Sequence, residues 1–186
     1  MDFAQHFRRN WINLVILSLA LGWVWVSRAP QGTTTAGLIP APQTGFLAPA
    51  FSLSTLAGGQ IHSDDLRGKV VLLNIWATWC PPCRAEMPAM QQVYQEYQAQ
   101  GFEILAVNAT AQDTLSNLEP FVTEYGLSFP ILLDPQGSVT RLYQARSLPT
   151  SFFIGRDGII REIVVGGPID EALLRARVEK LLQEAE

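Results

Sequence analysis

Residues 70–83 read VVLLNIWATWCPPC, and this stretch decides the fold. Its first half, Val70 to Trp76, is a nearly continuous apolar run, which is typical of a strand buried on both faces of a sheet. Its second half places Cys80 and Cys83 directly after that strand. The two prolines between the cysteines favour the first turn of a helix. The stretch therefore predicts a buried strand that leads into a helix, with the cysteines at the junction.

The segments on either side of this stretch predict an α/β domain. Upstream, residues 51–53 and 60–62 flank Ala57-Gly58-Gly59 and indicate a small hairpin. Downstream, a helix is expected from about Pro82 to Gln100, with Gly101 as its C-terminal cap. A second buried strand should follow at residues 102–109.

The C-terminal half continues the alternation of helices and strands. Helical spacing over residues 115–125 stops at Gly126, and Pro120 either starts a shorter helix or kinks a longer one. A short strand is expected at residues 130–133 and a short helix near residues 137–143. Residues 151–154 and 159–165 indicate an antiparallel hairpin. The chain closes with an amphipathic helix over residues 170–186, with these side chains expected inward: Leu173, Leu174, Val178, Leu181 and Leu182.

Charge and cysteine count exclude several classes of protein. The chain of 186 residues has a formal net charge of -4, and Arg8, Arg9 and Arg28 all lie near the N-terminus, so the remainder is more acidic still. Nucleic acid is therefore not expected as a partner. The 2 cysteines are too few for a disulfide-stapled scaffold and wrongly spaced for a structural zinc site.

An uncharged apolar segment lies near the N-terminus. Trp11 to Val26 reads WINLVILSLALGWVWV and is flanked by arginines on both sides. This segment predicts a membrane anchor within residues 1–28, and a cleaved signal peptide is the alternative. We favour the anchor because Pro30 follows the best cleavage site. Positive charge ahead of the segment places the N-terminus inside and the remainder outside the cytoplasm.

Residues 29–49 are expected to form a flexible linker. They are rich in proline, glycine, threonine and alanine and show no amphipathic period. The predicted organisation is thus an anchor at 1–28, a linker at 29–49 and one α/β domain at 50–186.

The position of the cysteines indicates redox chemistry. A thiol at a helix N-terminus loses its proton more readily, because free backbone N–H groups and the helix dipole stabilise the thiolate. Cys80 is expected to face solvent and attack a disulfide, and Cys83 is expected to resolve the mixed disulfide. A metal site is the alternative, but the chain has only His6 and His62 as histidines and no further cysteine. We expect no metal and no cofactor.

Residues 74–88, NIWATWCPPCRAEMP, resemble the signature of the TlpA/ResA-like thiol-disulfide oxidoreductases, a membrane-tethered branch of the thioredoxin superfamily. Further matches are Pro88 in the helix, Tyr125-Gly126 followed by residues 129–134, and Leu148-Pro149-Thr150. The resemblance runs from about Phe46 to the C-terminus. It implies a thioredoxin-like fold, that is a central mixed β-sheet flanked by helices, with an added N-terminal hairpin and a β-α insertion.

The resemblance also implies roles for residues around the cysteines. Pro149 is the expected cis proline, which with Leu148 would contact an extended substrate. Trp79, Pro81 and Pro82 are expected at the rim that substrates touch. The implied activity is reduction of disulfides in partner proteins such as apocytochrome c, with a membrane protein of DsbD/CcdA type as electron donor.

Two departures from the family pattern concern the proton acceptor. Thioredoxins have a buried aspartate six residues before the first cysteine, where this chain has Asn74. Several relatives supply a buried glutamate after the strand equivalent to Val107-Asn108. This chain has no acid there before Asp113, which we interpret as a helix N-cap.

The remaining polar and aromatic residues are interpreted structurally. Trp76 is expected in the core, and His62 is expected to be structural or exposed. Arg84 and Glu86 in the first helical turns indicate a solvated face, with tuning of the thiolate as the alternative.

Two other functions are alternatives for a chain with this cysteine pair. A peroxidase of related fold would need a P-x-x-x-T-x-x-C arrangement, but Leu73 and Ala77 occupy the proline and threonine places. A metal-handling or scaffolding protein that uses the cysteine pair as ligands remains the alternative to an oxidoreductase.

Overall fold

The computed structural model describes residues 16–19 and 39–184. Ile16–Leu19 is helical, and residues 39–184 form a separate unit. Within these two described ranges, no helix has the length and apolar character needed to cross a bilayer. Most of the expected anchor and linker residues 29–38 lie outside the described residues, so the predicted division at residue 28 stays a prediction.

A mixed sheet of five strands forms the centre of the domain. The strands are β3 (Val70–Trp76), β4 (Phe102–Asn108), β5 (Ile131–Leu133), β6 (Thr150–Ile154) and β7 (Ile160–Val165), in the order β5-β4-β3-β6-β7. Central β3 runs parallel to β4 and antiparallel to β6. All seven residues of β3 are buried, as its apolar sequence predicts for a strand covered on both faces.

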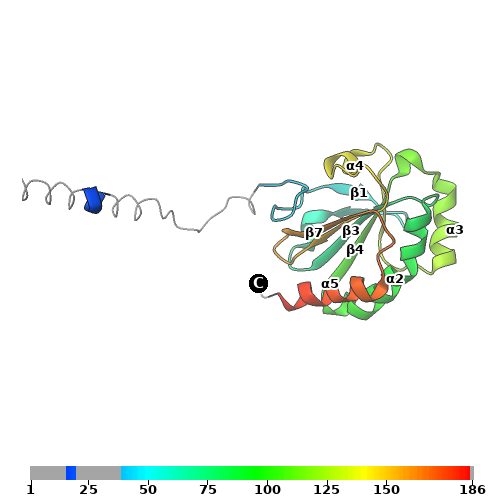
Figure 1. Ribbon diagram of the computed structural model, residues 1–186. Coiled ribbons are helices and arrows are strands. Elements are labelled where there is room, and N and C mark those ends of the chain that lie inside the picture. Colours follow the sequence, from blue (N-terminus) through cyan, green and yellow to red (C-terminus); the bar gives the residue numbers. More distant parts are fainter. Residues whose placement is uncertain (1–15, 20–38, 185–186) are drawn as a thin grey trace, which may run out of the picture. The chain divides into compact units, whose positions relative to one another are not determined.

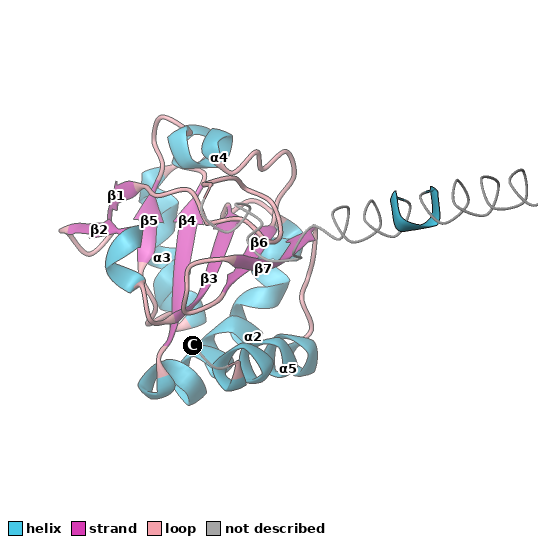
Figure 2. Ribbon diagram, turned by 90° about the vertical axis from the view of Figure 1, so that its left-hand side faces the viewer, coloured by secondary structure: helices cyan, strands magenta, loops and turns pink. Residues whose placement is uncertain are grey.

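Helices cover the two faces of this sheet unequally. The helices are α2 (Pro81–Tyr97), α3 (Leu115–Tyr125), α4 (Ser138–Leu142) and α5 (Glu171–Gln183). Figures 1 and 2 show α2 and α5 side by side on one face. The apolar core on that face also includes α3, whereas α4 and the N-terminal hairpin contribute to the core on the opposite face. The thioredoxin-like fold class is confirmed.

Alternation along β3 assigns its residues to the two cores. Val70, Leu72 and Trp76 belong to the core beneath α2, and Leu73 and Ile75 belong to the other. Successive side chains of a strand point to opposite faces. The polar residue at position 74 therefore points toward α2, the helix that carries the cysteines.

Proline and glycine set the course of the two longer helices. Helix α2 continues through Pro88, and α3 continues through Pro120 as one helix, so the shorter alternative starting at Pro120 is wrong. Gly101 and Gly126 follow these helical segments with φ of 91° and 60°, a left-handed conformation in which glycine is favoured.

One inward side chain of the last helix was assigned wrongly. Leu174, Val178 and Leu181 of α5 are buried as expected, but Leu173 is 48% exposed. The helix begins at an N-cap aspartate, Asp170, which accepts hydrogen bonds from the N–H groups of residues 172 and 173. The resulting rotation leaves Leu173 outside the buried stripe.

The expected N-terminal hairpin is present as β1 (Ser52–Ser54) paired antiparallel with β2 (Gln60–His62). It joins the main sheet at the outer edge of β5, where the Leu56 N–H donates to the Ile131 carbonyl at 2.9 Å. The hairpin thereby covers part of an otherwise open strand edge. His62 is exposed, in agreement with the prediction.

The expectation of a flexible linker up to residue 49 does not hold for its last part. The Gly45 N–H donates to the Ile160 carbonyl at 2.8 Å, and the Ile160 N–H donates to the Phe46 carbonyl at 2.9 Å. Pro49 is buried, and its carbonyl accepts from the Tyr143 hydroxyl at 2.7 Å. This segment hydrogen-bonds to β7 because that edge strand offers unpaired backbone groups.

Candidate active site

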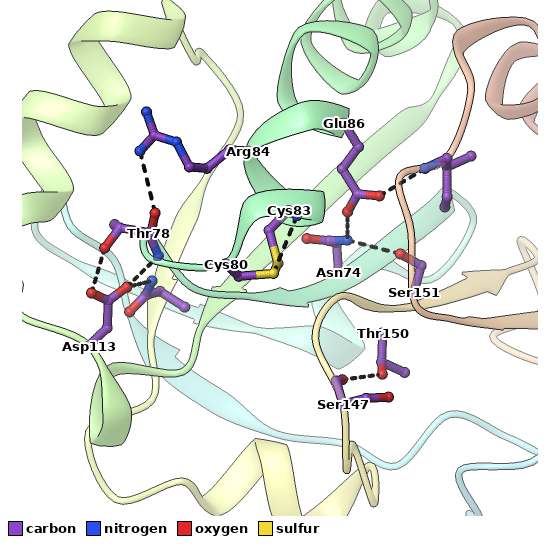
Figure 3. The surroundings of a disulfide bond; sticks show 12 residues. Asn74, Thr78, Cys80, Cys83, Arg84, Glu86, Asp113, Ser147, Thr150 and Ser151 are labelled. Carbon is purple, nitrogen blue, oxygen red and sulfur yellow. Dashed lines mark hydrogen bonds between the residues drawn. A yellow bond between two sulfur atoms is a disulfide. The ribbon is translucent and has the colours of Figure 1, made fainter.

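Cys80 and Cys83 lie at the junction of β3 and α2, as the sequence predicts, and are joined by a disulfide. Their Cα atoms are 5.3 Å apart. Figure 3 shows the pair at the first turn of the helix, with polar side chains on both sides. The described residues thus contain a disulfide between two cysteines of one helical turn, at the end of a buried strand.

Helix geometry favours a thiolate at Cys80 over one at Cys83. Cys80 is the N-cap of α2, and its sulfur accepts a hydrogen bond from the Cys83 N–H at 3.3 Å. Pro81 and Pro82 occupy the next two positions and have no N–H to donate. A thiolate on Cys80 would therefore receive this one backbone N–H together with the field of the helix terminus.

Burial partly corrects the prediction that Cys80 faces solvent. In the disulfide Cys80 is 3% exposed and Cys83 is 0% exposed. Cys80 nevertheless lines a hollow of about 270 Å³, which Cys83 does not line.

The expected rim residues gather around this hollow. Trp79, Pro81, Pro82 and Leu148 all line it, and Trp79 is 55% exposed. The indole Nε1 of Trp79 donates to the Gln112 carbonyl at 2.8 Å, which fixes the ring at the entrance. A partner that enters this hollow therefore meets the exposed Trp79 at its rim.

The Leu148–Pro149 peptide bond is cis, as the resemblance implied. Pro149 is buried, and its carbonyl accepts from the Gly166 N–H at 2.8 Å. The hydroxyl of Thr150 donates to the Ser147 carbonyl at 2.7 Å and holds the loop from the other side. Figure 3 shows this loop near the cysteines.

Glu86 is the main correction to the sequence analysis. The prediction of a solvated face is wrong for this residue, because its side chain is 0% exposed. Its Oε1 accepts from Asn74 Nδ2 at 2.8 Å, and its Oε2 accepts from the Ile169 N–H at 3.1 Å. Burial raises the pKa of the Glu86 carboxyl, and these two hydrogen bonds oppose that rise only in part.

Asn74 lies between Glu86 and the cysteines (Figure 3). Its Nδ2 also donates to Ser151 Oγ at 2.9 Å, so both amide protons are used. Its Oδ1 is buried and has no hydrogen-bond partner among the described residues. Figure 3 shows this oxygen on the side of the amide that faces the disulfide. A buried acceptor thus points toward the cysteines, with a carboxylate of raised pKa behind it.

Glycine at position 167 allows the carboxylate to lie close to the cis-proline loop. A Cβ at Gly167 would lie 2.8 Å from Pro149 Cγ and 2.9 Å from Glu86 Oε2. Both separations are shorter than van der Waals contact. The backbone at Gly167 therefore packs directly against Pro149 and Glu86, with no room for a side chain between them.

Asp113 has a different role from the N-cap that was expected. The N-cap of α3 is Thr114. Asp113 accepts from the N–H and hydroxyl of Thr78, both at 2.6 Å, and from Asn108 Nδ2 at 2.9 Å and the Thr114 N–H at 2.8 Å. Burial alone would raise the pKa of this carboxyl, but the hydrogen bonds from Asn108, Thr78 and Thr114 outweigh it and lower the pKa.

Arg84 is half-buried rather than part of a free solvated face. Its guanidinium pairs with Glu124 at 3.2 Å and lies over the rings of Phe121 and Tyr125, at 5.2 and 5.4 Å from their centroids. It also approaches the Thr78 carbonyl at 3.4 Å. Arg84 therefore packs α2 on α3 through Phe121, a ring that also contacts the core aromatic Trp76.

The position of Glu86 could have been inferred from its spacing. It lies three residues after Cys83, and residues three or four apart share a helix face. The buried residues Cys83, Glu86, Met87 and Met90 follow this spacing. The charge of the side chain masked this signal, because a carboxylate at such a position is usually exposed.

The site combines a disulfide at a helix N-terminus with a cis proline, on a five-stranded mixed sheet. This combination defines the class of the protein as a thiol-disulfide oxidoreductase of the thioredoxin superfamily. A family model described as the AhpC/TSA family matches residues 44–163, and the chain belongs to that family.

Proteins similar to this chain are thiol-disulfide oxidoreductases. The thiol-disulfide oxidoreductase ResA of Geobacillus thermodenitrificans is 41% identical over 167 residues, which cover 89% of this chain and 91% of the relative. ResA of Halalkalibacterium halodurans is 39% identical over 100% of both chains. A solved structure from Chlorobium tepidum, assigned as a thiol:disulfide interchange protein DsbE, has a TM-score of 0.69 at 35% identity and covers 75% of this chain and 98% of its own.

Proposed function

We propose that this protein is a membrane-tethered reductant of disulfides in partner proteins outside the cytoplasm. The observation that carries the proposal is the N-cap geometry of Cys80, whose sulfur has one backbone donor because the next two residues are prolines. An oxidant of this fold needs a strongly stabilised thiolate, which makes the reduced form the stable one. With one donor, the Cys80 thiolate is stabilised modestly, which favours donation of electrons.

The reaction proceeds in two exchange steps. The Cys80 thiolate attacks one sulfur of a partner disulfide, forms a mixed disulfide and releases the other partner sulfur as a thiolate. Cys83 then loses its proton and attacks Cys80, which forms the Cys80–Cys83 disulfide and releases the second partner thiolate. The partner gains two electrons and, from solvent and the site, two protons. Glu86, buried one helical turn beyond Cys83, is the group that accepts the Cys83 proton.

The N-terminal sequence supports a tether. Apolar residues 11–26 follow Arg8 and Arg9, and proline-rich residues follow before the domain. This pattern supports an orientation with the N-terminus in the cytoplasm and the domain on the outer side. After carbonate extraction, we expect the full chain to remain with the membranes. Recovery of a soluble form that begins near Pro30 would mean that the segment is a cleaved signal peptide.

The resemblance to the TlpA/ResA-like branch supports particular partners. A dithiol in an oxidising compartment must be reduced again after each cycle, and a membrane protein of DsbD/CcdA type is the proposed donor. The proposed substrates are the cysteines of apocytochrome c. The tether would keep the domain near both the donor and the substrates as they leave the membrane.

Trapping of mixed disulfides tests the function. Cys83→Ser removes the resolving thiol, so partners should accumulate on Cys80 as reducible conjugates in cells. Cys80→Ser is the matched control and should trap few or none. Apocytochrome c and a DsbD/CcdA-type protein are the expected conjugates. Equal trapping by both variants, or none by Cys83→Ser, would contradict the proposal.

A further inference from the structure

The hollow beside Cys80 carries one ionisable side chain besides the cysteine itself. Arg146 lines it, in the loop between α4 and the cis proline, together with Trp79, Ser147 and Leu148. Its other lining residues are neutral, and the Arg146 side chain is exposed. A partner segment that reaches Cys80 through this hollow therefore meets one positive charge.

Arg146 differs from the other arginines of the described domain. Each of those donates to a protein oxygen, as Arg84 does to Glu124 at 3.2 Å and Arg141 does to the Gln136 carbonyl at 2.8 Å. Within residues 39–184, no hydrogen bond or ion pair is formed by Arg146. Its five N–H donors are available to a ligand, and a carboxylate matches their planar fork.

We propose that Arg146 is a specificity-determining residue that selects partner segments with an acidic side chain beside the reactive cysteine. This inference rests on the proposed function. A partner sulfur placed against Cys80 puts its neighbouring residues between Trp79 and residues 146–148. A glutamate or aspartate there pairs with Arg146, whereas a lysine meets a like charge.

The selection depends on short-range contact. The chain has a formal net charge of -4, so its overall field does not attract an acidic partner. An exposed ion pair contributes at most about 1 kcal/mol, which corresponds to about fivefold in rate. Screening by salt weakens such a pair, so the preference should be largest at low ionic strength.

Three synthetic peptides test the inference on the full-length reduced protein in detergent. The three peptides have the same length, and each contains one internal disulfide. The residues that flank both cysteines are glutamate in the first peptide, glutamine in the second and lysine in the third. The rate of exchange is measured at low and high salt. Each rate is divided by that for dithiothreitol, a small dithiol that also attacks as a thiolate but carries no positive charge, which removes intrinsic differences between the peptides. We expect the glutamate peptide to react about fivefold faster than the lysine peptide at low salt.

Variants assign the preference to Arg146. Arg146→Gln should make the three normalised rates equal, and Arg146→Glu should reverse their order. Arg141→Gln removes the same charge from α4 outside the hollow and should keep the wild-type preference. An unchanged preference in Arg146→Gln, or no preference in an active wild type, would overturn the inference. A wild type that reduces neither these peptides nor insulin would instead overturn the proposed function.

Discussion

Two carboxylates lie on opposite sides of the cysteine pair, and their environments differ in the number of hydrogen-bond donors. Asp113 accepts four hydrogen bonds, two of them from Thr78, and its pKa is lowered. Glu86 is fully buried, accepts two, and its pKa is raised by burial. Figure 3 shows both on either side of the disulfide.

The comparison separates a structural carboxylate from a reactive one. A carboxylate surrounded by donors stays ionised and holds its neighbours, because protonation would break those bonds. A carboxylate with few donors in a buried site takes up and releases a proton near physiological pH more easily. Asp113 therefore orders the segment before Cys80, and the environment of Glu86 supports its proposed role as the acceptor of the Cys83 proton.

The largest expected effect comes from Glu86→Gln. Glutamine keeps the size of the side chain but cannot accept a proton from Cys83. The rate of disulfide reduction should fall on the order of 10²-fold, the lower range for loss of a general base. The wild-type rate should also fall as pH decreases through the raised pKa of Glu86, and this step should be absent from the variant. Stopped-flow exchange between pH 4 and 8 measures both.

Glu124→Gln is the control for that experiment, because Glu124 is exposed and pairs with Arg84 on the surface. It should leave the rate and the pH profile unchanged. A profile that is the same in Glu86→Gln and in wild type would show that Glu86 accepts no proton.

The next effect is on stability. Asp113→Ala removes the acceptor for four hydrogen bonds and should cost about 2 to 3 kcal/mol, more than the loss of a helix cap. Because the pKa is lower in the folded state, this stabilisation is present above the unfolded pKa of about 3.9 and is lost as pH falls through the folded value. The difference from wild type should be constant from pH 5 to 8 and shrink below about pH 4. Urea unfolding at several pH values measures it.

Thr78→Val is the matched variant, since it removes one of the four donors and should cost less. The pH profile of exchange should be unchanged in Asp113→Ala. A shifted profile would make Asp113 a proton acceptor and erase the distinction from Glu86.

A smaller effect is expected at Gly167. Gly167→Ala places a Cβ against both Pro149 and Glu86, and such overpacking should cost about 1 to 2 kcal/mol and slow exchange. Gly126→Ala is the comparison variant, because its left-handed φ is strained by about 1 kcal/mol while no atom lies within 4 Å of the new Cβ. It should lose stability without losing rate. Equal rates in the two variants would show that the contact around Gly167 does not matter for exchange.

The sequence predicts the fold and the positions of the cysteines and Pro149, but it does not predict the environment of the carboxylates near the cysteines. The apolar run of β3, the cysteines at the helix start and the motif at Pro149 are local patterns, and the structure agrees with each. Burial of Glu86 depends on Asn74 and on the Ile169 N–H, which is 83 residues away in the chain. The local sequence does not contain that partner. Because charged residues in a first helical turn are usually exposed, the sequence predicts exposure for Glu86.

The role of Asp113 was missed for a related reason. An aspartate just before an apolar helical pattern predicts an N-cap. Its tertiary partner Thr78 lies 35 residues upstream and takes both of its oxygens. In the same way, the proline-rich composition of residues 29–49 predicts a linker, whereas hydrogen bonds to Ile160 of β7 and to Tyr143 hold residues 45–49 in the domain.

The reduction potential of the Cys80–Cys83 pair tests the central claim most directly. The full-length protein in detergent is equilibrated with glutathione or dithiothreitol buffers, and the fraction of disulfide is measured after acid quenching and alkylation. With one backbone donor to the Cys80 sulfur, the potential should lie near that of thioredoxin, about -270 mV. A potential above roughly -150 mV would place the protein among the oxidants and contradict the account.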